Sequence, residues 1–266
     1  MNYKIFKPYE DRMIAFSTER EGYFVNNIEG NSQGKYGHLN LCHYVNDNPN
    51  HVAHNRQLFC QYHNLNPNTL FIPRQTHTNN VKEVGTEFDF ENTDGLISNL
   101  EGSCIGINTA DCLPILIYDP THHAAATLHA GWRGLVGKIA TKGIALMKEK
   151  YNSTPSELLC AVGPAISTEA YEVGDELKPL FAEAGFPIAE IFIDRKDWAK
   201  SHLDLKAAVK YELLCNGIAE HNIEISNICT YQNSAKYFSA RKLGIDSGRI
   251  FSGIILKSQK YVVAHK

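Results

Sequence analysis

Cys112 and His129 carry side chains that can bind a metal or act as a nucleophile, and both lie at the ends of predicted strands. Cys112 precedes the apolar run 113–118, and His129 ends the run 124–129, directly before a glycine-rich turn. A turn at residues 119–121 lies between these two runs. If the runs pair as an antiparallel hairpin, their outer ends meet. We therefore expect Cys112 and His129 to be close in space.

A third candidate, His77, follows in the polar stretch 74–77. One cysteine and two histidines give zinc three protein bonds and leave one position for water or substrate, as in catalytic zinc sites. Thiolate and imidazole suit the intermediate softness of zinc. Alternatively, Cys112 is a nucleophile with His129 or His77 as its base, or a small apolar residue of the core. The residue types and spacing leave these alternatives open.

A glycine-rich turn after His129 is a candidate anion site. Residues 131–134 lead into a predicted helix from Leu135, so backbone N–H groups, the helix N-terminus and the Arg133 guanidinium would converge there. The same glycines also suit a plain strand-to-helix turn. Other polar candidates are Glu172, ahead of a predicted helix, and a group of cations near the C-terminus: Arg241, Lys242 and Arg249.

The elements that must position these residues alternate irregularly between strands and helices. Short apolar runs predict strands at 13–17, 104–108, 113–118, 124–129, 159–162, 225–231, 250–256 and 261–264. Apolar residues at helical spacing predict helices at 49–63 with Asn50 as N-cap, from Leu135 onward, and at 174–184 and 203–216. This order is typical of an α+β fold, with mixed β-sheets packed with helices in a single compact domain.

Length and composition exclude several classes of protein. The 266 residues, 43% of them hydrophobic, suit a globular chain, and a net charge of −3 provides no basic field for nucleic acid. No apolar run reaches the roughly 18 residues of a membrane span, and residues 1–16 show no signal peptide. The seven cysteines include no Cys-Xaa-Xaa-Cys pair, which favours free thiols. We therefore expect a cytoplasmic protein without nucleic-acid or membrane partners; no oligomeric state is indicated.

Several motifs occur together in a recognisable order. They are QTH at 75–77, TADCLP at 109–114, HAGWRG at 129–134, GPAI at 163–166, YEVG at 171–174 and FSAR at 238–241. With these motifs the chain resembles the YfiH family, also called the laccase-domain or polyphenol oxidoreductase family. The match runs from about Leu39 to Arg249, and the segment 129–134 is highly specific. The resemblance implies the YfiH-type fold, as one catalytic domain over residues 1–266.

The resemblance also implies a site and an activity. His77, Cys112 and His129 would bind one zinc ion, which copper can replace in vitro because copper outcompetes zinc at most nitrogen and sulfur sites. The protein would be a purine nucleoside phosphorylase that uses phosphate and acts on adenosine, inosine, guanosine and methylthioadenosine. It would also have adenosine deaminase activity.

Further residues are candidates for catalysis and for substrate contacts. Asp111, beside Cys112, would support a ligand or carry a proton, although an aspartate in a turn is often a local backbone acceptor. The chain departs from the family pattern at Thr78 and around Arg241, at Ala240 and Lys242, which bears on substrate preference more than on the metal. The candidates for sugar or phosphate contacts are Asn40, Arg133, Ser239 and Arg241.

Three other functions compete with this hypothesis. A multi-copper laccase usually requires several His-Xaa-His pairs, and the chain has none. A hydrolase that edits cell-wall precursor peptides would use the same metal without phosphate. A zinc-bound scaffold for a partner protein would need no turnover at all. Among these functions, the sequence favours the phosphorylase.

Overall fold

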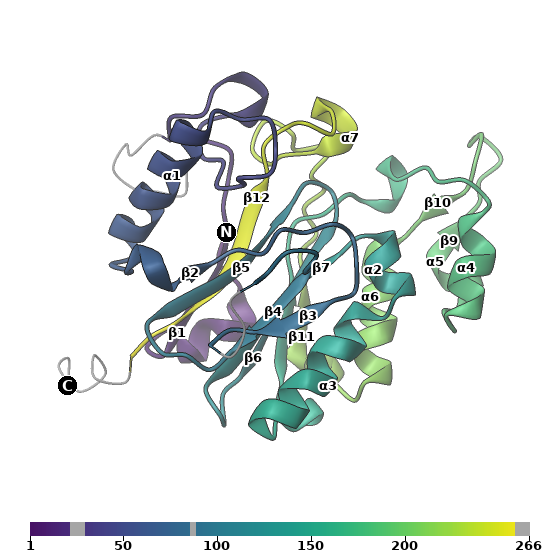
Figure 1. The fold of residues 1–266 in the computed structure, drawn as a ribbon. Coiled ribbons are helices and arrows are strands. Elements are labelled where there is room, and N and C mark those ends of the chain that lie inside the picture. The colour runs from purple at the N-terminus through teal and green to yellow at the C-terminus, as the bar shows by residue number, and fades with distance from the viewer. Residues whose placement is uncertain (22–29, 86–88, 259–266) are drawn as a thin grey trace.

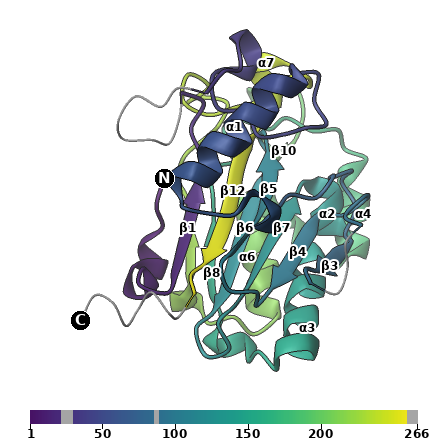
Figure 2. The same ribbon diagram turned by 60° about the vertical axis from the view of Figure 1, so that its left-hand side comes forward.

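Two β-sheets pack face to face at the centre of the protein, and helices cover their outer faces (Figures 1 and 2). The computed structural model describes residues 1–21, 30–85 and 89–258. One sheet has the order β11 (Ile223–Ile225), β8 (Leu159–Val162), β6 (Leu113–Asp119), β7 (Ala124–Ala130), β4 (Gly95–Ser98), β3 (Val81–Glu83). The other has the order β1 (Met13–Ser17), β12 (Ile250–Leu256), β5 (Ser103–Thr109), β2 (Leu70–Phe71). Two short strands, β9 (Phe192–Ile193) and β10 (His202–Leu203), pair separately.

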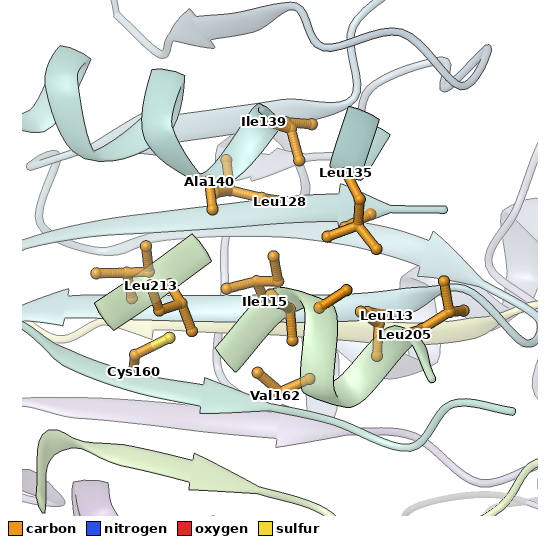
Figure 3. Close-up of a cluster of buried hydrophobic side chains, with 14 of the residues drawn as sticks. Leu113, Ile115, Leu128, Leu135, Ile139, Ala140, Cys160, Val162, Leu205 and Leu213 are labelled. Carbon is orange, nitrogen blue, oxygen red and sulfur yellow. The ribbon is translucent and has the colours of Figure 1, made fainter. Parts of the chain in front are cut away.

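The central strands are buried on both faces. Along β6, Ile115 and Ile117 face the helices, whereas Leu116 and Tyr118 face the other sheet, as the alternation of side chains in a strand requires. Figure 3 shows the helix side of this core, where Leu128 lies beneath α3. Burial on both faces explains why these strands are continuous apolar runs in the sequence. The α+β fold class is confirmed.

Helices cover both sheets. On the six-stranded sheet lie α2 (Trp132–Val136), α3 (Ile139–Tyr151) and α6 (Leu205–Cys215), and this core extends to α4 (Leu177–Glu183) and α5 (Ile188–Ile191). On the four-stranded sheet lies α1 (Pro49–Tyr62), and α7 (Ala240–Leu243) precedes β12. Short 3-10 helices are η1 (Lys4–Tyr9), η2 (Gly34–Tyr36), η3 (Pro67–Thr69), η4 (Pro155–Glu157), η5 (Thr168–Ala170) and η6 (Glu220–Asn222). Within the described ranges, no helix has the length and apolar character that crossing a membrane demands.

Two helix predictions need correction. The N-cap of α1 is Asn48, not Asn50, and its side chain accepts the Asn50 N–H at 2.9 Å. Pro49 takes the first helical position because its φ is preset and its missing N–H would have no partner there. The helix predicted from Leu135 onward is two helices, because Lys138 adopts a left-handed backbone with φ 58°. That residue separates α2 from α3.

One predicted strand is largely wrong. The strand expected at 225–231 ends at Ile225, because its partner strand β8 ends at Val162. The chain then turns, and Cys229 forms only an isolated bridge to Ala165. The strand expected at 261–264 lies outside the described residues. The predicted helices 174–184 and 203–216 correspond to the shorter α4 and α6.

Candidate metal centre

The β6–β7 hairpin brings Cys112 and His129 together, and a loop supplies His77. Pro114 pairs with His129 across the hairpin, so Cys112 lies at the same end. One potential ligand atom from each of the three side chains lies within 4.8 Å of the others, and Cys112 Sγ is 4.0 Å from His77 Nε2. The predicted proximity of Cys112 and His129 is confirmed. This trio can hold a metal ion.

The backbone at Gly131 approaches the side chains of Cys112 and His77 closely. A Cβ on Gly131 would lie 3.0 Å from Cys112 Sγ and 3.3 Å from His77 Cδ2. The φ of Gly131 is −78°, which any residue adopts, so close approach alone explains the glycine. Burial falls from His129, which is buried, through Cys112 to the exposed His77, so the trio opens toward solvent. The donor set and this opening fit a catalytic zinc ion.

Replacing Gly131 with alanine should therefore disturb metal binding. The added methyl would crowd Cys112 and His77, and overpacking of about 1.4 kcal/mol corresponds to about tenfold weaker zinc binding. A competition titration with a chromophoric chelator measures the affinity. Gly134→Ala is the matched control, since its Cβ would approach the backbone carbonyl of His129 at 3.2 Å and none of the ligating side chains of the trio. Equal zinc affinity in wild type and Gly131→Ala would contradict the explanation.

Asp94 connects the two histidines. This fully buried carboxylate places Oδ1 2.7 Å from His129 Nδ1 and accepts the His77 N–H on the same oxygen at 3.1 Å. Its Oδ2 accepts the N–H groups of Thr76 and Thr78 and the Thr78 hydroxyl. These bonds hold His77 at φ 62°, a left-handed conformation that costs energy for a residue other than glycine. Asp94 therefore orients both imidazoles.

Sequence reasoning missed Asp94. The residue lies 35 positions from His129 in the chain, and only the antiparallel pairing of β4 with β7 brings them together. The available signal was an aspartate directly before the short run Gly-Leu-Ile at 95–97. Thr78, one of the departures from the family pattern, contributes its hydroxyl to the same carboxylate.

Charges within the site are strongly coupled. Burial opposes ionisation of Cys112, but the imidazoles of His129 and His77 outweigh it and lower the pKa of the thiol to about 6. Burial likewise opposes protonation of His129, but the Cys112 thiolate and Asp94 raise its pKa to about 9. Hydrogen bonds from His129 and Thr78 outweigh burial and lower the pKa of Asp94. Without a metal, the site holds a thiolate–imidazolium pair.

This pair should exist in the metal-free protein between about pH 6 and about pH 9. Because the folded-state pKa of Cys112 is lowered, its stabilisation is lost as pH falls through 6; because that of His129 is raised, its stabilisation is lost as pH rises through 9. The ultraviolet absorbance of the thiolate, measured against pH as wild type minus Cys112→Ala, reports the first step. A midpoint near 9 would contradict this coupling.

Asp111 is placed to position Cys112. Its Oδ1 accepts the Thr230 hydroxyl at 2.6 Å, and its Oδ2 accepts the Arg241 N–H at 2.7 Å. Its carbonyl accepts the Ile166 N–H at 2.9 Å. The backbone is left-handed, with φ 83°, immediately before Cys112. Both carboxylate oxygens are thus engaged inside the protein, as expected of an aspartate that shapes a turn.

A cavity of about 270 Å³ reaches all three members of the trio. Its walls come from segments far apart in the chain, including residues 44–46, residues 245–246 and Arg249. The volume is slightly below the roughly 300–1,000 Å³ that is typical of small-molecule sites. A small ligand in this cavity would contact a metal held by the trio.

Two predicted substrate contacts are buried elsewhere. Asn40 is completely buried, donates to Asp47 at 2.9 Å and accepts the Arg249 N–H at 3.1 Å. Ser239 is also completely buried and caps α7 by accepting the Lys242 N–H. Because these polar atoms are engaged inside the protein, neither side chain lines the cavity.

The two predicted arginines lie outside the cavity lining. Arg133 is exposed and stacks on Trp132, with its guanidinium carbon 4.1 Å from the ring centre. Arg241 is exposed and lies over the Tyr171 ring at 5.4 Å. The helix that contains Arg133, α2, has five residues and is too short for a strong dipole. The arginine that lines the cavity is Arg249, which was grouped with the C-terminal cations but not assigned to the site.

Comparison with known proteins identifies the family. Residues 21–257 match the family described as multi-copper polyphenol oxidoreductase laccase. The chain belongs to this family. The crystal structure of the Bacillus licheniformis hypothetical protein YfiH resembles this laccase-domain chain with a TM-score of 0.84 and 26% identity, covering 92% of this chain and 93% of that one. The resemblance to the YfiH family is confirmed.

Relatives of this laccase-domain chain carry enzyme names. A protein of Bacteroides thetaiotaomicron named purine nucleoside phosphorylase is 35% identical over 93% of this chain and 97% of its own length. A protein from an unknown prokaryotic organism, named adenosine deaminase RL5, is 36% identical over 91% of this chain and 94% of its own length. Within the described residues, the trio is the one cluster suited to a metal, whereas a multi-copper oxidase requires several. The comparisons therefore do not favour the laccase or the cell-wall hydrolase.

Proposed function

We propose that the protein is a zinc-dependent purine nucleoside phosphorylase that also deaminates adenosine. The observation that carries the proposal is the cavity that reaches His77, Cys112 and His129 together. The names of the two relatives, which cover more than nine-tenths of the chain, support the same activity. The substrates would be adenosine, inosine, guanosine and methylthioadenosine, each with phosphate as the second substrate of phosphorolysis.

Zinc held by the trio would supply a Lewis acid at the inner end of the cavity. The protein's own groups prepare this place. Asp94 holds His129 with Nδ1 toward the carboxylate, so that the other ring nitrogen faces the site. Asp111 fixes the turn that presents Cys112. The walls of the cavity surround a bound nucleoside and limit the water that reaches it.

A phosphate substrate needs positively charged groups to bind it. Our candidates for this role are Arg133 and Arg241. The Arg241 guanidinium lies over the Tyr171 ring at 5.4 Å. Burial raises the pKa of the Tyr171 hydroxyl, and the charges of Cys112, Arg241 and Arg133 also act on it. Within the described ranges, neither arginine forms an ion pair with a carboxylate. Unpaired guanidinium groups are well suited to binding phosphate. Arg249 provides a third positive charge, from the cavity wall.

Product analysis tests the proposal. Protein of known zinc content is incubated with adenosine, with and without phosphate, and the products are separated by liquid chromatography. Adenine and ribose 1-phosphate should form only with phosphate, whereas inosine would report deamination. A fully zinc-loaded protein that forms neither adenine nor inosine would overturn the proposal.

We also infer that the protein works in the cytoplasm. All seven cysteines are free, and five of them are buried. A reducing compartment preserves such thiols, including the one in the trio.

A further inference from the structure

The mouth of the cavity joins two segments that lie 200 residues apart in the chain. Asn46 Nδ2 donates to Asp246 Oδ1 at 3.4 Å, and both residues line the cavity. This bond engages one carboxylate oxygen and the amide nitrogen. Asp246 Oδ2 and Asn46 Oδ1 have no hydrogen-bond partner in the described part of the protein. Each of these two joined side chains therefore keeps one free acceptor at the mouth.

An exposed apolar side chain lies beside these acceptors. Ile245 also lines the cavity and is 71% exposed, more than any other large apolar side chain among the described residues. Val45 lines the cavity next to Asn46. Covering such apolar surface with a ligand is favourable, at about 25 cal/mol per Å². The mouth thus combines apolar surface with two acceptors.

The segment that carries Asp246 is held rigidly. The Arg249 guanidinium donates to the carbonyls of Ile245, Ser247 and Gly248. The Arg249 N–H donates to the buried Asn40. These bonds fix the turn before a ligand arrives, and such preorganisation reduces the entropic cost of binding. Asn40 therefore acts at the site indirectly, by anchoring this turn.

We propose that Asp246 and Asn46 bind the vicinal diol of a ribose and that Ile245 packs against the same nucleoside. The inference rests on the proposed function and adds a selectivity to it: ribonucleosides over 2′-deoxyribonucleosides. A vicinal diol has two O–H donors, which match the two free acceptors. A carboxylate is the usual partner of ribose hydroxyls in dinucleotide-binding proteins.

Paired measurements on two nucleosides test the selectivity. The kcat/KM of phosphorolysis and the equilibrium Kd are determined for adenosine and 2′-deoxyadenosine, with zinc content measured for each sample. Wild type should prefer adenosine about tenfold, the effect of one hydrogen bond to a charged group at an exposed position. Asp246→Ala should reduce the preference to about twofold or less, with a higher KM for adenosine and an unchanged zinc content.

Asp11→Ala is the matched control. Asp11 is exposed and lies two residues before Met13, which pairs with Leu256 at the end of β12 remote from Asp246. This variant should keep the full preference for adenosine. Since Asp246 is also exposed, neither change threatens folding.

The outcomes separate this inference from the proposed function. Formation of adenine without preference for the ribonucleoside, or with the same preference in Asp246→Ala, overturns the diol contact and leaves the phosphorylase intact. Preferential binding of adenosine without adenine or inosine formation overturns the proposed function and supports the diol contact. Equal Kd values for both nucleosides in wild type overturn the diol contact whether or not product forms.

Discussion

Cys112→Ala is expected to abolish zinc binding and turnover while the protein stays folded. The change removes one of the three proposed zinc ligands. Loss of a residue that only supports a ligand lowers metal affinity by up to about a hundredfold, so loss of the ligand itself should lower zinc affinity by more than that. Folding should persist, because Cys112 is partly exposed at the cavity and lies outside the large apolar clusters between and around the sheets. Zinc per chain, adenine release and thermal unfolding are the three measurements.

The matched control for this variant is Cys215→Ala. Cys215 is an exposed thiol at the end of α6 and belongs to no cluster suited to a metal. It should keep both zinc and activity. If Cys112→Ala failed to fold, zinc would be serving the structure, as in a scaffold. If Cys112→Ala kept full activity, the trio would not be the catalytic centre.

Asp94→Asn is expected to have the second-largest effect, because one carboxylate orients both histidines. In wild type, the second carboxylate oxygen of Asp94 accepts the N–H groups of Thr76 and Thr78. Asparagine has a single acceptor oxygen, so its NH₂ group would face these two N–H donors, and no hydrogen bond could form there. Zinc affinity should fall about 10- to 100-fold. The free energy of unfolding should fall by about 3 kcal/mol, the lower range for breaking a buried ion pair.

A titration distinguishes this positioning role from simple destabilisation. Without the Asp94 charge, protonated His129 is less stable, so its pKa falls and the pKa of Cys112 in the metal-free protein rises above 6. Asp119→Asn is the matched control. Asp119 is also almost fully buried and lies 2.8 Å from His122 Nδ1, at the opposite end of the β6–β7 hairpin. It should destabilise the protein without changing zinc affinity or the titration of Cys112.

Failure of either part would contradict the role of Asp94. Unchanged zinc affinity in Asp94→Asn would mean that His77 and His129 keep their positions without the carboxylate. An equal loss of zinc affinity in Asp119→Asn would mean that general destabilisation, and not orientation of the ligands, weakens the site.

The sequence was sufficient for features that depend on nearby residues. The hairpin of β6 and β7 follows from two apolar runs separated by a short turn, and equal spacing from that turn places Cys112 beside His129. Gly131 follows two residues after His129, and its lack of a side chain is visible in the sequence. Local pattern and register therefore predicted the metal-binding end of the hairpin.

Contacts between remote segments were decided only by the tertiary structure. Asp94 reaches His129 because β4 pairs with β7, and Asp246 meets Asn46 across 200 residues of sequence. Asn40 and Ser239 have the residue types of ligand contacts, but packing buries both and engages their polar atoms. A side chain's type indicates which hydrogen bonds it can form. Only packing determines whether those bonds are made within the protein or remain available to a ligand.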